Sequence, residues 1–299
     1  MTIFNMASRE EIEMSSSAAA KAIYIGEHTA ICRVLNAYKM MVDTRDVGLV
    51  PHLLLEGYWE SWVTYAVSRI VRPGMRVVNV GANFGYYALL FADLVGPKGS
   101  VVAFEPNPTV YEMLRKSRAM NGFVHLEPRA EAVSDGRALR VRFAVPDGFC
   151  QNARIVSPDE DVTWLPNKDA ELEPDRMMLE GREAEVLLVR SVALDNCELG
   201  KIDFVFMDAE GAEPDIWQGM QGLVAANPEL ITVLEWSPRR PACPYPDPIG
   251  FAKRLAENGR RLFMIEPSGE LAQQTPASLV EEHDIPPEWA GECMLVVAS

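Results

Sequence analysis

Basic residues are in the minority in this chain of 299 residues, with 28 Lys and Arg against 43 Asp and Glu and a formal net charge of −15. Such a field repels phosphate backbones, so we expect no nucleic-acid partner. No apolar run reaches the ~18 residues of a membrane span, and no span is expected.

The five cysteines include no C-x-x-C pair, which argues against a disulfide framework and against a structural zinc site. Glu10, Glu11 and Glu13 precede any apolar run, so no secretory signal is indicated and a cytoplasmic location is expected.

The most informative stretch is Arg76–Pro108, which alternates between apolar runs and turns. It predicts a buried strand at Val77–Val80, a turn at Gly81–Gly85, a helix at Tyr86–Val95, and a strand at Val101–Phe104 that is followed by Glu105. Strand, turn, helix and strand in this order form half of a nucleotide-binding α/β unit. Such units bind their ligand at the carboxyl ends of the strands, over the first turn.

The spacing of the glycines indicates which nucleotide is bound. The turn reads G-x-x-x-G instead of the dinucleotide pattern G-x-G-x-x-G, and Tyr86 and Tyr87 stand where a phosphate-binding loop has Lys followed by Ser or Thr. Glu105 follows Gly81 by 24 residues and is placed to accept hydrogen bonds from two ribose hydroxyls. A ligand with a ribose and no phosphate fits, which points to S-adenosylmethionine; a tight turn without a ligand is the alternative.

The rest of the chain continues the alternation of strands and helices, which predicts one doubly wound α/β sheet. We expect residues 1–55 to form a small N-terminal appendage of strands or a helix, and residues 56–299 to form the main domain. One helix is expected from Ala209–Pro214 to about Ala226. Residues 147–185 carry eleven acidic and four basic residues, and we interpret them as an acidic insertion, a loop with short helical pieces. This insertion is either a solvated excursion or a lid over the substrate.

Five motifs in order resemble the FkbM family of S-adenosylmethionine-dependent methyltransferases. They are Gly57-Tyr-Trp-Glu60, Val80-Gly-Ala-Asn-Phe-Gly-Tyr-Tyr87, Phe104-Glu-Pro-Asn-Pro108, Ala132-Val-Ser-Asp135 and Met207-Asp-Ala-Glu-Gly-Ala-Glu213. The resemblance implies a Rossmann-like sheet of seven strands whose last strand is antiparallel. It also implies methyl transfer, usually to a hydroxyl, and many relatives act on sugars or secondary metabolites.

Two positions depart from the family pattern. The family commonly has Asp where this chain has Asn79, and Lys where it has Phe206. A neutral amide cannot pair as a charge with the ammonium of the cofactor. If the family Lys assists catalysis, this chain has to work without it.

The candidate site residues follow from the strand ends and from the resemblance. We expect cofactor contacts from Glu60, Gly81, Asn83, Gly85, Tyr86, Glu105, Pro106, Asn107, Glu131, Ala132 and Asp208. We expect substrate orientation and proton removal from Asp208, Glu210 and Glu235. Carboxylates around one pocket are also apt for Mg²⁺, but the spacing does not require a metal and none is assigned.

The acceptor is expected to be a small molecule that is methylated on oxygen. N-methylation of an amine or a protein side chain, a non-catalytic cofactor-binding module and, less compatible with the glycine spacing, a NAD-dependent oxidoreductase are the alternatives. A homodimer formed through the N-terminal appendage is a further hypothesis.

Overall fold

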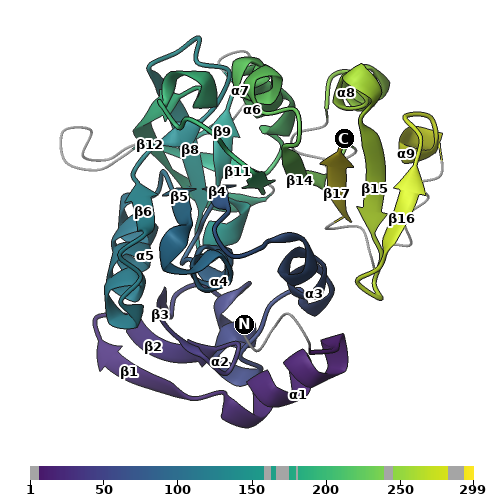
Figure 1. Ribbon diagram of the computed structural model, residues 1–299. Helices are drawn as coiled ribbons and strands as arrows, with labels where there is room; N and C mark the ends of the chain where they lie inside the picture. The colour runs from purple at the N-terminus through teal and green to yellow at the C-terminus, as the bar shows by residue number, and fades with distance from the viewer. Residues whose placement is uncertain (1–6, 158–162, 166–174, 180, 239–244, 282–292) are drawn as a thin grey trace.

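The centre of the molecule is one mostly parallel β-sheet with helices on both faces (Figure 1). The computed structural model describes residues 7–157, 163–165, 175–179, 181–238, 245–281 and 293–299. The strands of this sheet lie in the order β16-β15-β17-β14-β13-β4-β5-β6. Their bounds are β4 Arg76–Val80, β5 Ser100–Phe104, β6 Leu126–Arg129, β13 Phe204–Met207, β14 Ile231–Trp236, β15 Arg261–Ile265, β16 Leu271–Gln274 and β17 Cys293–Ala298.

The direction of the strands agrees with the expected methyltransferase topology. Strands β14, β13, β4, β5 and β6 are parallel to one another, and β17 is antiparallel to both β14 and β15. The expected number of seven strands was wrong for the described residues, because β16 adds an eighth strand antiparallel to β15. Strand β16 has only four residues and lies at the edge of the sheet, so its sequence carries little periodic signal.

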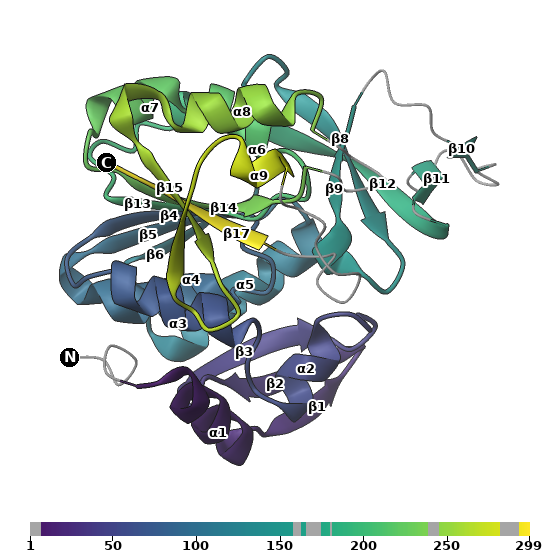
Figure 2. The same cartoon turned by 90° about the vertical axis from the view of Figure 1, so that its right-hand side faces the viewer.

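Helices form a layer on each face of the sheet, as Figure 2 shows. One layer contains α3 Ser61–Ile70, α4 Tyr86–Val95 and α5 Pro108–Asn121, and the other contains α6 Glu213–Gln218, α7 Gln221–Ala226 and α8 Pro248–Leu255. The short α9 spans Ser278–Glu281. Helix α4 is buried almost all round, which explains its continuous apolar sequence. Among the residues that the structure describes, no helix is both long and apolar enough to span a membrane.

The single helix expected up to Ala226 was wrong, because the chain forms α6 and α7 with a break at Gly219 and Met220. The Asp195 carboxylate accepts the backbone N–H groups of Gly222 at 2.9 Å and Leu223 at 2.7 Å. A carboxylate at this place satisfies the free N–H groups of a helix start. A residue distant in the sequence therefore starts a new helix here.

The N-terminal appendage is a three-stranded antiparallel sheet with two helices. It contains α1 Arg9–Ala19, β1 Ala22–Gly26, β2 Thr29–Val34, β3 Tyr38–Asp43 and α2 Val50–Leu55. Strand β3 packs against α5, and α1 packs against α3. One cluster of buried apolar side chains runs from Ile12 in α1 through α4 to Phe204 in β13, so the appendage extends the core of the main sheet.

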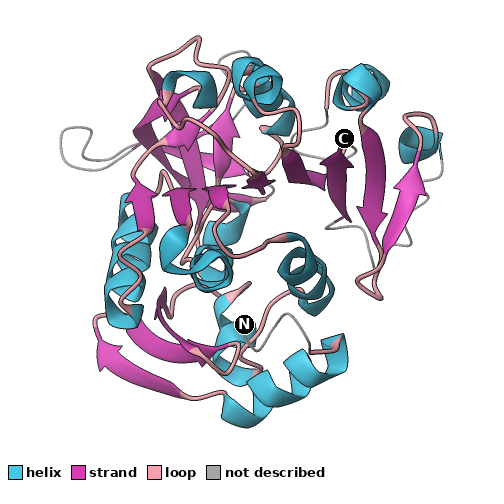
Figure 3. Cartoon of the chain, viewed as in Figure 1, coloured by secondary structure: helices cyan, strands magenta, loops and turns pink. Residues whose placement is uncertain are grey.

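The described part of the acidic insertion lies mostly in strands of a second sheet, so the expected loop was wrong there, and Cys150–Asn152 forms a short 3-10 helix (Figure 3). The order of this sheet is β10-β11-β12-β8-β9, and β7 pairs with β12. The bounds are β7 Ala132–Val133, β8 Arg140–Pro146, β9 Arg154–Val156, β10 Thr163–Trp164, β11 Asp175–Leu179 and β12 Arg182–Val192. Residues 158–162, 166–174 and 180 of the insertion lie outside the described residues. The acidic residues misled the interpretation, because an antiparallel sheet with one solvated face accommodates charges on alternate positions.

The turn between β4 and α4 is shaped by contacts within the protein. Gly81 has φ +72°, and a Cβ placed on it would lie 1.8 Å from the carbonyl oxygen of Asp208. Gly85 has φ +103°, and its Cβ would lie 2.5 Å from Cδ1 of Leu114. The two glycines therefore let β4 approach the β13 loop and let α4 approach α5.

We expect Gly81→Ala to unfold the protein or to lower its free energy of unfolding by several kcal/mol. The left-handed backbone alone costs about 1 kcal/mol for alanine, and the contact with the Asp208 backbone cannot be relieved by a side-chain rotation. Gly74→Ala is the matched control, because Gly74 has φ +86° and no atom within 4 Å of its Cβ position. Urea denaturation measures both, and equal losses of stability in the two variants would contradict this account.

Candidate functional site

The carboxyl ends of β4, β5 and β13 converge on one pocket, together with parts of the appendage and the insertion. The pocket is lined by Leu49, Trp59, Val80, Gly81, Ala82, Asn83, Tyr86, Tyr87, Phe104, Glu105, Pro106, Glu131, Ala132, Val133, Phe143, Cys150, Gln151, Ala153, Ile155, Asp208, Ala209, Glu210 and Ala212. Parallel strands place their carboxyl ends at one edge, which explains why three motifs distant in sequence meet here.

Glu105 lies at the end of β5 and joins the first two turns. Its carboxylate accepts the backbone N–H groups of Asn83 and Asn107, both at 2.8 Å. The side chain is buried, and burial raises its pKa to about 7, although the two backbone hydrogen bonds oppose the shift. Each carboxylate oxygen has a second lone pair, so Glu105 can accept two hydroxyl groups from a ligand in the pocket.

Asn107 and Gly85 were predicted to contact the cofactor, and neither lines the pocket. The Asn107 side chain caps α5, accepting the N–H groups of Thr109 at 3.0 Å and Val110 at 3.4 Å. Pro106, between Glu105 and Asn107, does line the pocket. The motif after β5 therefore combines one pocket residue with one helix cap.

An aromatic group closes one end of the pocket. The Tyr87 hydroxyl donates to the Glu60 carboxylate at 2.6 Å, and the Tyr86 hydroxyl lies 3.0 Å from the hydroxyl of Thr64. Glu60 precedes α3 with a left-handed backbone, φ +39°, which is strained for a residue with a side chain. Glu60 is buried and does not line the pocket, so it acts on this end through Tyr87.

Phe206 stands where the family commonly has Lys, and it packs inside the core. Its ring centroid lies 4.5 Å from that of Tyr87 and 5.5 Å from that of Phe91. The side chain is 1% exposed and does not line the pocket. Asn79, the other departure, is also buried, and its side-chain N–H₂ lies 3.5 Å from the Val80 carbonyl oxygen. Both departures therefore lie beneath the floor of the pocket.

Three acidic side chains gather near the end of β13. Asp208, Glu210 and Glu235 each place a carboxylate oxygen within 4.8 Å of the others, close enough for one divalent cation. Asp208 and Glu210 line the pocket, whereas Glu235 lies inside β14, is 1% exposed and does not line it. The predicted acidic group is thus brought together, with two of its members at the pocket surface.

The loop that carries Asp208 and Glu210 is held by Glu213. The Glu213 carboxylate accepts the N–H groups of Ala209 at 2.8 Å and Gly211 at 3.0 Å and the hydroxyl of Tyr245 at 3.1 Å. Burial raises the pKa of Glu213 to about 7, and the nearby charge of Asp208 adds to this shift. Glu213 therefore positions the loop.

The third strand unit contributes Glu131 and Ala132, which both line the pocket. Glu131 forms an ion pair with Arg190 at 3.0 Å. Ala132 belongs to β7 and pairs with Ser191 of β12. This pairing places strand β12 next to two residues that were expected to contact the cofactor.

The second sheet and the insertion supply pocket residues that the sequence did not identify. Phe143, Cys150, Gln151, Ala153 and Ile155 come from β8, from β9 and from the segment between them. The alternation of apolar residues in β8 is a signal that could have indicated an inward face for Phe143. The approach of β9 to the pocket depends on tertiary pairing and has no local signal.

A buried aspartate connects the appendage to this segment. Asp46 accepts the backbone N–H and the thiol of Cys150, both at 3.0 Å. Its other oxygen accepts the N–H groups of Leu49 at 2.8 Å and Val50 at 3.0 Å. Leu49 and Cys150 both line the pocket, so this contact fixes two walls relative to each other.

Comparison with known proteins identifies a family that this chain matches. The sequence model described as "Methyltransferase FkbM domain" matches residues 79–262. Protein-L-isoaspartate O-methyltransferase of Methanothrix thermoacetophila is 45% identical over 47 residues, 16% of this chain and 22% of that protein. The enzyme of the same name from Methanopyrus kandleri is 38% identical over 52 residues, 17% of this chain and 23% of that protein. The chain thus spans less than a quarter of the length of these curated relatives.

The comparison with solved structures found similarity to the following two proteins, among others. The structure titled methyltransferase FkbM from Methylobacillus flagellatus is 11% identical with a TM-score of 0.42, over 74% of this chain and 43% of that chain. The structure titled TYW2 of M. jannaschii in complex with AdoMet is 13% identical with a TM-score of 0.45, over 92% of this chain and 87% of that chain.

We expect the affinity of the pocket for adenosine to depend on the ionisation of Glu105. Ribose hydroxyls donate to a carboxylate, so affinity is near its full value about one pH unit above the pKa of about 7. It falls as the pH drops through this pKa, by up to about tenfold per pH unit. Calorimetry with adenosine between pH 5.5 and 8.5 measures this, because adenosine lacks the titrating amine of the full cofactor. Glu105→Gln should bind weakly at every pH, whereas Glu213→Gln should keep the dependence. A flat profile in the unaltered protein would contradict the assignment.

We expect Phe143→Ala to weaken the binding of S-adenosylhomocysteine about tenfold, because it removes apolar surface from the pocket wall. Val189→Ala is the matched control, since Val189 packs in the same buried cluster as Phe143 but does not line the pocket. Both variants should lose stability, and only Phe143→Ala should lose affinity by calorimetry. Equal affinities in the two variants would remove Phe143 from the binding wall.

Proposed function

Because the chain belongs to the FkbM methyltransferase family, we propose that it transfers a methyl group from S-adenosylmethionine to a hydroxyl of a small molecule, a sugar or a secondary metabolite. One observation carries the proposal. The turn after β4, the Glu105 carboxylate and the acidic loop of Asp208 and Glu210 all line the same pocket. In such a pocket Glu105 can accept hydrogen bonds from ligand hydroxyls, and the loop of Asp208 and Glu210 supplies negative charge.

The residues of the pocket fit the chemical parts of this cofactor. Glu105 is placed for the ribose hydroxyls, and Phe143 and Ile155 offer apolar surface for a flat base. At the other end, Trp59 and Tyr87 offer aromatic faces, which attract cations. The bound cofactor would supply an electrophilic methyl group attached to a positively charged sulfur.

The acidic loop is suited to the acceptor. In the reaction the acceptor oxygen forms a bond to the methyl carbon, and the carbon–sulfur bond breaks with its electron pair remaining on sulfur. The hydroxyl proton has to leave, and we assign its removal to Asp208 or Glu210, which line the pocket. The Glu213 contacts hold the backbone at Ala209, between these two acids, and at Gly211, directly after Glu210. The two acids therefore keep one arrangement during the reaction.

Orientation accounts for a further part of the catalysis. Transfer requires the acceptor oxygen to lie in line with the bond that breaks, about 3–3.5 Å from the carbon. The walls that could restrict an acceptor include Leu49 of the appendage and Gln151 of the insertion, and Trp59 lies between the appendage and α3. We therefore propose that these two additions select the acceptor.

We expect both Asp208→Asn and Glu210→Gln to lower kcat for methyl transfer. The variant that replaces the residue that removes the proton should lose about 10²–10⁴-fold. Glu210→Gln should leave the affinity for S-adenosylhomocysteine within about threefold of the unaltered protein, because a loss of transition-state stabilisation need not weaken ground-state binding. Glu229→Gln, at an exposed acid outside the pocket, is the control and should keep full activity.

The measurement is a mass-spectrometric screen of acceptors for the gain of one methylene unit, with panels of sugars, phenols, carboxylates and amines. A methylated hydroxyl supports the proposal. A methylated amine supports N-methylation instead. Cofactor binding without transfer to any panel member would favour a binding module and overturn the proposed reaction.

A further inference from the structure

Strand β1 of the appendage is an apolar strand at the open edge of its sheet. The sheet has the order β1-β2-β3, and no strand in the described part of the chain pairs with the outer side of β1. Ile23, Tyr24 and Ile25 are 69%, 62% and 52% exposed. Three consecutive large apolar residues on a free edge are unusual, because such an edge is a template for pairing with another chain.

The backbone of β1 has polar groups directed to this edge. Ala22 pairs with Cys32 and Tyr24 with Ala30, and the Arg33 N–H donates to the Lys21 carbonyl at 2.9 Å. In an antiparallel ladder, residues that exchange hydrogen bonds with the neighbour alternate with residues that face away. Lys21 and Ile23 therefore face β2, and Ala22 and Tyr24 direct their N–H and C=O groups outward.

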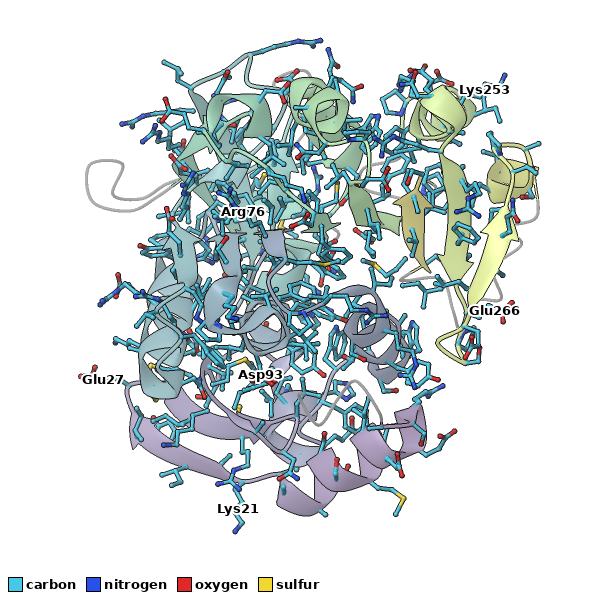
Figure 4. All side chains as sticks on the ribbon, in the orientation of Figure 1. Lys21, Glu27, Arg76, Asp93, Lys253 and Glu266 are labelled. Atoms are coloured by element: carbon cyan, nitrogen blue, oxygen red, sulfur yellow. The ribbon has the colours of Figure 1, made fainter. Side chains whose placement is uncertain are left out.

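The sequence around Tyr24 is complementary to itself. An antiparallel pairing of two copies centred on Tyr24 places Tyr24 opposite Tyr24, Ile23 opposite Ile25, and Lys21 opposite Glu27. Both charged residues are exposed. Lys21 directly precedes β1, Glu27 directly follows it in the turn to β2, and both lie at the periphery of the molecule (Figure 4). A two-fold axis repeats the Lys21–Glu27 pair at each end of the interface.

We propose that β1 pairs with β1 of a second copy of this chain, in the antiparallel register centred on Tyr24. The pairing joins two three-stranded sheets into one sheet of six strands. Opposite charges and apolar pairs across strands favour this register, and a shift by one residue would separate the charges. A five-residue strand buries a small interface, so we expect a reversible dimer with a dissociation constant of about 1–100 µM.

The dimer should leave the pocket unchanged. No residue of β1 lines it, so binding of S-adenosylhomocysteine reports whether a variant has kept its fold. The inference also holds independently of the methyl acceptor, because it concerns a surface outside the pocket.

The first test is analytical ultracentrifugation of the full chain between about 1 and 200 µM, a range that brackets the expected dissociation constant. We expect a concentration-dependent species with twice the chain mass of 33.2 kDa. Ile23→Lys should raise the dissociation constant at least tenfold, because two lysines on the joined edges repel each other. Leu188→Lys is the matched control, because Leu188 is an apolar residue of strand β12 that is 62% exposed, and this variant should keep the dimer. A monomer at every concentration would overturn the proposal.

The second test identifies the register by charge reversal. Lys21→Glu alone places two glutamates at each end of the interface, and Glu27→Lys alone places two lysines there, so each should weaken the dimer about tenfold. The double variant K21E/E27K restores opposite charges and should dimerise as the unaltered chain does. The backbone at position 27 has φ +48°, a conformation that Glu and Lys tolerate about equally.

Mixing the two single variants gives the sharpest result, because only the mixed dimer has opposite charges at both ends. We expect the mixture to form a heterodimer with the affinity of the unaltered dimer. A dimer that responds to none of these changes, or single variants that are not rescued by mixing or by the double exchange, would overturn the register. At protein concentrations well below the dissociation constant, where every variant is monomeric, melting temperature and S-adenosylhomocysteine affinity should be unchanged.

Discussion

The pocket depends on one buried carboxylate. Glu105 accepts hydrogen bonds from the Asn83 and Asn107 backbones and so locks together the turns that follow β4 and β5. Burying a carboxylate is costly unless hydrogen bonds compensate it, and here they come from the two loops whose positions matter. Asn83 has a left-handed backbone, φ +49°, and the contact with Glu105 stabilises this conformation. The carboxylate is thereby held ready for a ligand while it fixes the floor of the pocket.

Additional polar contacts extend this floor into an enclosed site. Glu213 holds the loop of Asp208 and Glu210 through two backbone N–H groups. Asp46 joins the appendage to the insertion through Cys150. In each case an acidic side chain with several N–H donors replaces regular secondary structure where loops must keep a defined shape. The additions to the central sheet are thus attached at the pocket, where they can influence which acceptor enters.

Much of the central sheet was predictable, and much of the insertion was not. Helix α4 has the predicted bounds, and strands β4 and β5 each begin one residue before the predicted start. Buried strands and helices between glycine and proline breaks give a strong local signal. Strands β11 and β16 are short, lie beside solvent and carry polar residues, so their pairing leaves little trace in the sequence. The start of α7 depends on Asp195, a partner that no local pattern in α6 or α7 reveals.

The sequence by itself determined the parallel α/β order, the edge at which the motifs meet, and the presence of Glu105 and Asp208 at strand ends, because these follow from local periodicity and from the geometry of parallel sheets. Tertiary structure decided which motif residues reach the pocket. Position 85 requires glycine because the Leu114 side chain would collide with a Cβ atom there. Asn107 caps α5, and Glu60 accepts a hydrogen bond from Tyr87. The physical reason is that a side chain satisfies its volume and its hydrogen bonds with whatever neighbours folding brings to it, and those neighbours come from segments distant in the sequence.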